Sequence, residues 1–276
     1  DLDVWYNGNE LINKVCEVNN NVIVVINAPA TVNVPWKDKV KAIIFSGFPG
    51  AESGNAIADI IFGKENPSGH LPFVWGNETD YPPSTSYPLE NLTVVNEKTG
   101  ETYKDVYRYD GVGSVGNTDN EQDHEREQYD YTEGLYLGQR WFNKKGTKAI
   151  YPFGHGLSYT TFEYSDLSVS MNKEGLTAEF KVKNTGDVKG KAVPMMFLTF
   201  PESIGDYPEY IFKGFEKVEI EPGETKTVKI LADDHALSYF NVDKNKYVRV
   251  NKGEIKVFIS DNGDPKKSLL NDTITS

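Results

Sequence analysis

Hydrophobic residues follow two different patterns along the chain, and the change from one to the other divides the molecule. In the N-terminal part they form short uninterrupted runs at residues 22–26 and 42–45, each of which predicts a strand buried on both faces. Apolar residues recur at the spacing of one helical face over residues 9–18 and 51–62, and Gly63 is a typical helix stop. The pattern predicts parallel strands covered by helices.

The predicted α/β unit has too few strands to form a sheet by itself. Residues 1–90 supply two strands, whereas sheets usually contain about four or more. We therefore expect another segment to complete the sheet. The chain also starts abruptly at Asp1 without an initiator Met, so we interpret it as a processed piece whose signal peptide, if it had one, was removed.

Residues 91–161 are expected to connect this unit to the next one. Residues 119–133 carry seven acidic side chains against Arg126 alone, which indicates a solvated acidic loop. A calcium site is not expected there, because the spacing lacks the glycine turn and the ordered ligand positions of such a site. The pattern LYLGQRWF within residues 134–142 predicts a strand, followed by a turn at residues 143–146.

From residue 162 onward, apolar and polar positions alternate in short stretches separated by turns. About seven such stretches can be recognised, with turn sequences at residues 184–186, 221–224 and 261–263. This pattern is typical of an immunoglobulin-like or fibronectin type III sandwich, so residues 162–276 are predicted to form a complete all-β domain. The predicted fold class is α/β plus all-β, with a partial parallel α/β sandwich followed by a β-sandwich.

Composition and charge limit the partners. The 276 residues are 38% hydrophobic and 12% aromatic, which is enough for packed cores, and no apolar run approaches the roughly 18 residues of a membrane span. A net charge of -12 argues against nucleic acid and anionic lipid as partners, because both would repel the chain. Neutral ligands such as sugars are unaffected by this charge.

One cysteine and three sequons bear on the cellular compartment. Cys16 lies at an apolar position of the first predicted helix, so we expect a buried, inert thiol, and a bridge to another chain is the alternative. Asn77, Asn91 and Asn271 each begin an N-x-S/T sequon in turn-rich sequence. These sequons predict glycosylation and fit a secreted, extracellular protein.

Several motifs match the residue pattern of a catalytic or cofactor-binding site, but they lack the sequence context that such a site needs. Gly111, Gly113 and Gly116 form a G-x-G-x-x-G pattern, but an acidic stretch follows it instead of a helix, so we expect a loop and no dinucleotide site. Ser53 is not a nucleophile elbow, because G-x-S-x-G is absent in register. Glu52 is explained by a favourable interaction with the dipole of the helix that follows it.

The remaining ionisable candidates have structural explanations as well. No pair among the four histidines lies at metal-ligand spacing, so we predict no metal site. His155 lies between two glycines and is expected to hydrogen-bond to a neighbouring loop. Glu133 and Arg140 are interpreted as a structural ion pair on the short predicted strand. The residues by themselves indicate two folded parts without an active site. The histidines are His70, His124, His155 and His235.

Three longer stretches, at residues 48–59, 63–73 and 151–162, resemble successive signatures of family-3 glycoside hydrolases. Their sequences are FPGAESGNAIAD, GKENPSGHLPF and YPFGHGLSYTTF. Residues 131–142 resemble the segment that joins these signatures, and residues 2–8 resemble the start of a helix in the secreted fungal-type β-glucosidases of this family. The resemblance covers essentially the whole chain.

The resemblance implies an N-terminal (β/α)8 barrel, an α/β sandwich and a fibronectin type III-like domain, with this sequence beginning inside the second. It also implies a retaining β-glucosidase, in which an Asp on the barrel attacks the anomeric carbon and a Glu on a loop of the α/β sandwich protonates the leaving oxygen. Both residues lie outside this sequence. No catalytic, cofactor-binding or metal-binding residue is therefore assigned here, and the chain alone is expected to be inactive.

The expected partners follow from the same resemblance. They are a chain or segment that carries the barrel and the first part of the α/β sandwich, and a β-glucoside such as a cello-oligosaccharide; whether the complete enzyme forms a homo-oligomer stays open. The alternative is a noncatalytic module whose β-sandwich binds carbohydrate or protein, with Tyr207, Tyr210 and Phe212 as an aromatic platform. Glycan binding by residues 162–276 alone would favour this alternative.

Overall fold

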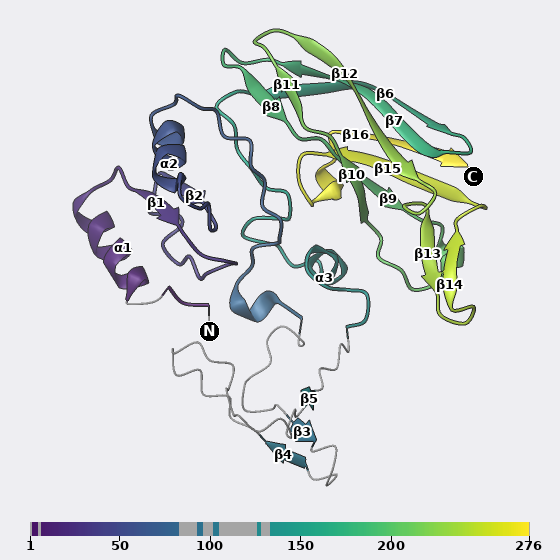
Figure 1. The fold of residues 1–276 in the computed structure, drawn as a ribbon, viewed down its shortest axis with the longest axis horizontal. Coiled ribbons are helices and arrows are strands. Elements are labelled where there is room, and N and C mark those ends of the chain that lie inside the picture. Colours follow the sequence, from purple (N-terminus) through teal and green to yellow (C-terminus); the bar gives the residue numbers. More distant parts are fainter. Residues whose placement is uncertain are drawn as a thin grey trace.

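The computed structural model contains two folded parts, a small α/β layer in the N-terminal half and a larger β-sandwich in the C-terminal half (Figure 1). The predicted fold class, α/β plus all-β, is confirmed by this arrangement. The structure describes residues 2–4, 7–82, 93–95, 102–104, 126–127 and 133–275.

The α/β layer is built on two parallel strands. β1 (Ile23–Ile26) and β2 (Ala42–Phe45) pair in parallel, with Ile23 opposite Ala42 and Ile26 opposite Phe45. α1 (Gly8–Val18) precedes the pair and α2 (Ser53–Ile61) follows it. The apolar runs and the helical spacing in the sequence therefore predicted these four elements correctly, with shifts of at most two residues at their ends.

An aromatic core packs against this pair of strands. Trp36 and Trp75 are almost completely buried in it. Each indole N–H has an acceptor: Trp36 Nε1 donates to Asn9 Oδ1 at 2.8 Å, and Trp75 Nε1 donates to the Val32 carbonyl at 2.9 Å. Because an unpaired polar group is costly to bury, these bonds allow two tryptophans to occupy the core.

The first part of the connecting region is described only in short pieces, whereas residues 133–161 are described without a gap. After η1 (Glu78–Asp80), the strands β3 (Thr93–Val95), β4 (Thr102–Lys104) and β5 (Arg126–Glu127) form an antiparallel sheet in the order β4-β3-β5 (Figure 1). The three glycines of the G-x-G-x-x-G pattern and most of the acidic stretch lie outside the described residues, so the loop predictions made for them stay predictions. Within the acidic stretch, β5 pairs with β3 and is not a loop.

The strand predicted over residues 134–142 is wrong, because the chain forms α3 (Gln139–Lys145) there. The Gln, Arg and Lys side chains of this segment are strong helix formers, and they outweigh the short apolar pattern. Phe142 is the residue of α3 that is buried, and Gly146, with φ of 67°, ends the helix in the left-handed conformation. The turn predicted at residues 143–146 is therefore the last helical turn with its cap.

The β-sandwich consists of antiparallel strands in two main sheets. One sheet has the order β10-β9-β15-β16 and the other has the order β12-β7-β6, and the pairs β11-β8 and β13-β14 accompany them. The 3-10 turns η4 and η5 lie in its loops. The bounds are β6 Phe162–Met171, β7 Gly175–Asn184, β8 Gly190–Ala192, β9 Met195–Thr199, η4 Glu202–Ile204, β10 Ile211–Phe215, β11 Val218–Ile220, β12 Thr225–Asp233, β13 Ser238–Asn241, β14 Lys246–Arg249, β15 Glu254–Ser260, η5 Pro265–Lys267 and β16 Leu270–Thr275.

Alternating side chains from both sheets fill the core of the sandwich. Phe180 of β7, Val228 of β12 and Ile255 of β15 are among the buried residues, and their neighbours along each strand are polar. β9 differs, because four consecutive residues, Met195–Leu198, are buried. The seven stretches predicted from the sequence correspond to β6, β7, β9, β10, β11, β12 and β15. The strands β8, β13, β14 and β16 were missed. β8 is only three residues long, and the other three lie at edges, where exposed side chains leave little alternation.

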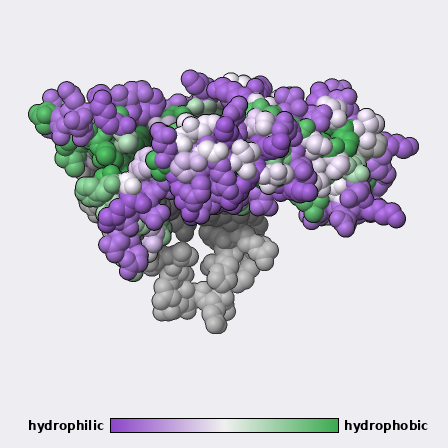
Figure 2. Space-filling view, turned by 90° about the horizontal axis from the view of Figure 1, so that it is seen from above, coloured by the Kyte–Doolittle hydropathy of each residue, from purple (hydrophilic) through white to green (hydrophobic). Residues whose placement is uncertain are grey.

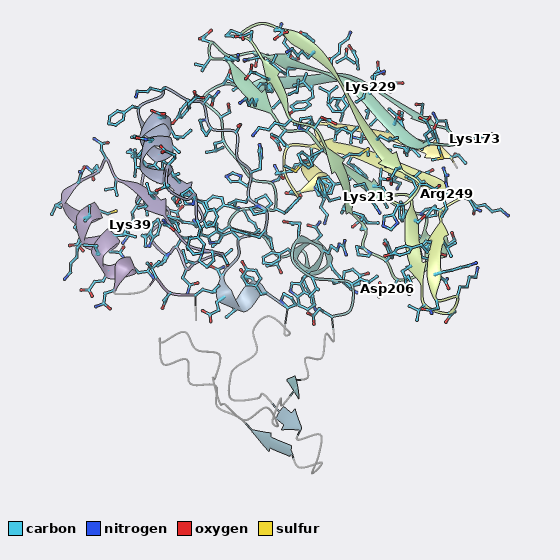
Figure 3. All side chains as sticks on the ribbon, in the orientation of Figure 1. Lys39, Lys173, Asp206, Lys213, Lys229 and Arg249 are labelled. Carbon is cyan, nitrogen blue, oxygen red and sulfur yellow. The ribbon has the colours of Figure 1, made fainter. Side chains whose placement is uncertain are left out.

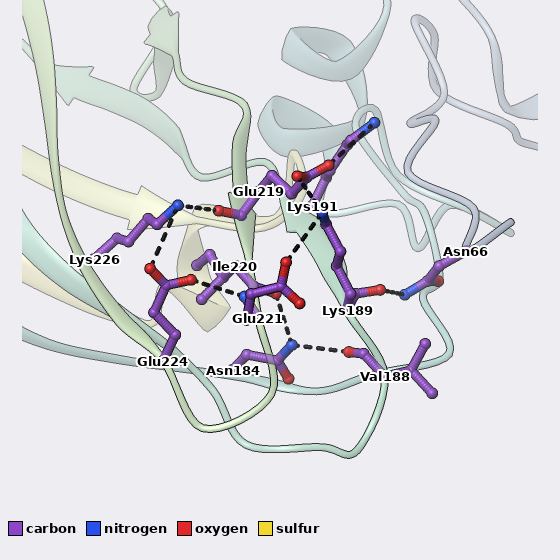
Figure 4. A network of polar contacts seen from close by, with 10 residues as sticks. All are labelled: Asn66, Asn184, Val188, Lys189, Lys191, Glu219, Ile220, Glu221, Glu224 and Lys226. Atoms are coloured by element: carbon purple, nitrogen blue, oxygen red, sulfur yellow. Dashed lines mark hydrogen bonds and ion pairs between the residues drawn. The ribbon is translucent and has the colours of Figure 1, made fainter.

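Polar contacts hold β7, β8 and β11 together at one corner of the sandwich (Figure 4). Asn184, at the end of β7, is completely buried and donates to two backbone carbonyls, at 2.8 and 3.0 Å. Next to it, Lys189 forms exposed ion pairs with Glu219 at 2.6 Å and Glu221 at 3.1 Å. Exposed ion pairs contribute little to stability, so we attribute the ordering of this corner mainly to Asn184.

Candidate functional site

The α/β layer leaves hydrophobic side chains uncovered. Neither α1 nor α2 contains a fully buried residue, and β1 is partly exposed, although parallel strands are normally covered on both faces. Figure 2 shows hydrophobic side chains gathered at the left end of the molecule, over α1, β1 and α2. We call the following exposed residues the open apolar surface: Leu11, Val15, Val18, Ile23, Val25, Phe48, Ile61 and Phe62.

The exposure of these side chains is large enough to require an explanation. Val18, Phe48 and Phe62 are 86%, 73% and 79% exposed. Soluble monomers rarely leave contiguous apolar patches larger than a few hundred Å², and burying one such side chain contributes about 1.5–3 kcal/mol. The open apolar surface therefore has the composition of a surface that contacts another protein segment.

Residues 63–73 and 151–162, two of the three stretches that carried the resemblance, lie side by side in the structure. The Leu71 N–H donates to the His155 carbonyl at 2.9 Å, and the Gly154 N–H donates to the Leu71 carbonyl at 2.7 Å. Two residues beyond the first stretch, Trp75 exchanges two more backbone bonds with Tyr151, at 2.7 and 3.0 Å. This backbone ladder joins the α/β layer to the chain that enters the sandwich.

Glycines and histidines pack closely within this ladder. A Cβ atom on Gly156 would lie only 2.5 Å from the carbonyl oxygen of Gly69, so a larger residue does not fit. His70 Nδ1 lies 2.6 Å from the carbonyl oxygen of Gly154. The backbone carbonyl of His155 takes part in the ladder. The imidazole ring of His155 stacks on the ring of Tyr151, with 4.9 Å between the ring centres. Burial, and to a lesser extent the nearby His70, lowers the pKa of His155.

Asn66 connects three parts of the chain at once. Its Oδ1 accepts bonds from the Tyr159 N–H at 2.8 Å and the Ser158 hydroxyl at 3.1 Å, and its Nδ2 donates to the Lys189 carbonyl at 3.0 Å (Figure 4). The Tyr159 hydroxyl in turn donates to the carbonyl of Ile60, at the end of α2, at 2.7 Å. One side chain thus holds the α/β layer, the entering chain and the sandwich in register.

A second contact joins the segment around α3 to the sandwich. The Tyr136 hydroxyl donates to Asp206, which lies beside α3 in Figure 3, and the Lys144 ammonium lies 3.3 Å above the tyrosine ring. Burial and the Asp206 carboxylate raise the pKa of Tyr136 to about 12. Arg140 lies on α3, so the strand geometry that we assumed for an ion pair with Glu133 is wrong.

The described glycosylation candidates are accessible. Asn77 immediately precedes η1, is exposed, and donates through Nδ2 to Asp80 at 2.8 Å. Asn271 is exposed on β16. Asn91 lies outside the described residues. An exposed position is what a sequon needs in order to be modified, and glycosylation at all three stays a prediction.

The residues that imitate catalytic groups are not brought together. Ser53 is the first residue of α2 and Glu52 precedes it, while His235 lies on the sandwich and His124 is outside the described residues. In the part of the chain that the structure describes, no three His, Cys, Asp or Glu side chains gather as metal ligands would, and no helix has the length and hydrophobicity to cross a membrane. Cys16 is half-buried and not fully buried as expected, because α1 has no fully buried position.

The suggested aromatic platform is only partly correct. Tyr207 and Phe212 line one open cleft, and Tyr210 lines a smaller cavity beside α3 together with Phe212, so the three rings do not share one site. The cleft also contains Lys213 and Tyr247, which the sequence analysis missed. No local signal in the sequence singles out Lys213 on β10 or connects it with Tyr247 on β14.

Comparisons with known proteins agree with the sequence signatures. Residues 1–159 match the model of the glycosyl hydrolase family 3 C-terminal domain, and residues 192–262 match that of the fibronectin type III-like domain. The thermostable beta-glucosidase B of Acetivibrio thermocellus is 34% identical over 263 residues, which are 94% of this chain and 30% of that protein. The probable beta-glucosidase I of Aspergillus clavatus is 33% identical over 275 residues, which are 95% of this chain and 28% of that protein.

Solved structures show the same similarity. The beta-glucosidase 3B from Thermotoga neapolitana, in complex with glucose, has a TM-score of 0.77 at 30% identity, and the match covers 100% of this chain and 34% of that one. For the GH3 beta-glucosidase of Bifidobacterium adolescentis the TM-score is 0.80 at 27% identity, with 100% and 36% covered. This chain therefore spans about a third of the length of the relatives it matches. The chain belongs to glycosyl hydrolase family 3, whose C-terminal domain it carries, followed by a fibronectin type III-like domain.

Proposed function

We propose that this chain is the C-terminal portion of a retaining β-glucosidase, whose catalytic Asp and Glu lie on a segment that this sequence does not contain. Membership of the family and the β-glucosidase relatives support this reaction class. In the proposed reaction, one carboxylate attacks the anomeric carbon and the other protonates the leaving oxygen. The substrate is a terminal non-reducing β-D-glucosyl residue of a cello-oligosaccharide or of another β-glucoside.

The observation that carries the proposal is the open apolar surface. A parallel sheet of two strands is smaller than a stable sheet, and its exposed Ile23 and Val25 are residues that a neighbouring layer would normally cover. The proposed occupant is the remainder of the same enzyme, with the barrel and the first strands of the α/β sandwich. The span of this chain, about a third of its relatives, is consistent with such an occupant.

The contribution of this chain to catalysis would be indirect. It would complete the α/β sandwich, on which the acid/base loop is carried, and hold this layer against the β-sandwich through Asn66 and the backbone ladder. We place the domain boundary between residues 161 and 162, with residues 91–161 as the connection after the α/β part at 1–90. The enzyme would be secreted and glycosylated at its sequons.

A reconstitution experiment tests the proposal. This chain and the remaining segment of the enzyme are produced separately, and hydrolysis of 4-nitrophenyl β-D-glucoside is measured for each and for the mixture. We expect neither part to hydrolyse the glucoside and the mixture to do so. We also expect this chain alone to bind a hydrophobic dye, and the mixture to bind much less of it. Hydrolysis by this chain alone, or a dye-free and cooperatively melting monomer, would contradict the proposal.

A further inference from the structure

An open cleft lies on the β-sandwich between β10 and the β13–β14 hairpin. Its volume is about 450 Å³, within the range of small-molecule sites. Residues of β10, of the turn that precedes β13, and of β13 and β14 line the cleft. The side chains of the cleft that matter here are Tyr207, Phe212, Lys213, Phe215, His235 and Tyr247.

Two phenylalanine rings of the cleft are placed together by a β-bulge. In a regular strand, residues three apart point to opposite faces. The register of β10 against β9 shifts between Phe212 and Gly214, so that the rings of Phe212 and Phe215 stack at 6.3 Å with an angle of 22°. Gly214 is required at this point, because a Cβ atom there would lie 2.9 Å from the side chain of Ile230. Bulges of this kind re-aim side chains near functional sites.

The aromatic side chains of the cleft are open to solvent. Phe215 and Tyr247 are 57% and 59% exposed, and Phe212 is 38% exposed. The ring of His235 lies 4.8 Å from that of Tyr247. Large aromatic side chains are normally buried in a core, so exposed rings on facing elements around one cleft indicate a binding surface.

A half-buried cation lies at the same cleft. Lys213 sits between the two phenylalanines in sequence, and its Nζ lies 5.1 Å from the ring centre of Phe200. Among the described residues, its ammonium has no hydrogen-bond acceptor and no carboxylate at ion-pair distance. Burial, and next the charge of Arg140, lowers the pKa of Lys213 to about 8. Such a group has donors to offer to a ligand.

We propose that this cleft is a carbohydrate-binding site, in which a pyranose ring stacks on Phe215 and Tyr247 and Lys213 donates a hydrogen bond to a sugar oxygen. The apolar C–H face of a pyranose matches an aromatic ring, and its hydroxyls match a few polar donors. The net charge of -12 does not oppose a neutral sugar. The site is a distinct feature of the fibronectin type III-like part and does not require the glucosidase reaction proposed above.

The test is affinity electrophoresis of the intact protein, in the length in which the organism makes it, through gels that contain barley β-glucan, xylan or glucomannan. We expect at least one polysaccharide to retard the protein. Phe215→Ala and Tyr247→Ala should each weaken this retardation about tenfold, corresponding to the loss of one stacking contact. Lys213→Met, which keeps the apolar stem, should weaken it about fivefold.

The control is Leu231→Ala, since Leu231 is 51% exposed on β12 and does not line the cleft. This variant should be retarded like the unchanged protein. Hydrolysis of 4-nitrophenyl β-D-glucoside, measured in parallel, should be the same in the Phe215 and Tyr247 variants, so that a failure of the proposed enzyme function is seen separately. No retardation in any gel, or equal retardation of the cleft variants and the control, would overturn the proposal.

Discussion

At the scale of single residues, Asn66 shows how one side chain can hold two domains in register. Its amide makes three hydrogen bonds, to the entering chain and to the sandwich. We expect Asn66→Ala to lower the free energy of unfolding by about 1–3 kcal/mol, because three hydrogen bonds are lost and the one from Ser158 is partly buried. Asn55→Ala is the matched control, since Asn55 is exposed and, among the described residues, its side chain bonds only to Glu52 in the same helical turn. Urea unfolding monitored by circular dichroism measures both, and equal effects would contradict the role of Asn66.

Gly156 is the residue whose size matters most at the ladder. The Cβ of Gly156→Ala would lie 2.5 Å from a backbone oxygen, which cannot move without shifting the chain, so we expect a loss of about 1–3 kcal/mol in stability. Gly69→Ala, on the facing stretch, has open space around its Cβ and should change stability by less than about 0.5 kcal/mol. Thermal unfolding of both variants decides the matter. A tolerated Gly156→Ala would show that the two stretches are not closely packed.

His155 links stability to pH. Its pKa is lowered from 6.5 in the folded protein, so the folded state favours the neutral ring and the unfolded state binds the proton more readily. The stabilising contribution is complete above about pH 6.5 and is lost as the pH falls toward the lower folded pKa. We expect His155→Gln to reduce the loss of stability that occurs as the pH falls below about 6.5, measured by urea unfolding at a series of pH values. An unchanged pH profile would show that another group is responsible.

At the scale of elements, the sequence patterns succeeded where local periodicity and burial coincide. The uninterrupted runs of β1 and β2 and the alternation of β7 and β12 predicted their strands. The strand prediction at α3 failed. A few apolar residues suggested a strand, but the helix-forming polar residues and the cap at Gly146 decided the conformation.

The end of α3 offers a test at this scale. Gly146 has φ of 67°, a conformation that costs other residues about 1 kcal/mol or more. We expect Gly146→Ala to destabilise the protein by about 1 kcal/mol, measured by urea unfolding, and Gly146→Asn to cost less, since Asn adopts this conformation more readily. Equal costs for both variants would contradict the capping role.

At the scale of the whole molecule, the open apolar surface is the feature that most needs a partner. Val18 on this surface and Val242 in the turn between β13 and β14 are similarly exposed, at 86% and 80%. If the rest of the enzyme covers Val18 and leaves Val242 exposed, Val18→Asp should weaken the association of the two separately produced parts by about tenfold or more. Val242→Asp should leave it unchanged. Calorimetric titration of one part into the other measures both, and equal effects would place the contact elsewhere.

The sequence by itself determined the two-part fold, the deficit of strands in the α/β layer and the family, because each of these is written in local patterns: apolar runs, alternation and contiguous motifs. Only the tertiary structure decided which segments meet. The sheet orders, the packing of Gly156 on Gly69 and the cleft between β10 and the β13–β14 hairpin all depend on contacts between residues far apart in the chain. The stacking of Phe212 on Phe215 further depends on a register shift against another strand. Such contacts arise from packing between elements, and packing leaves no periodic trace in any one of them.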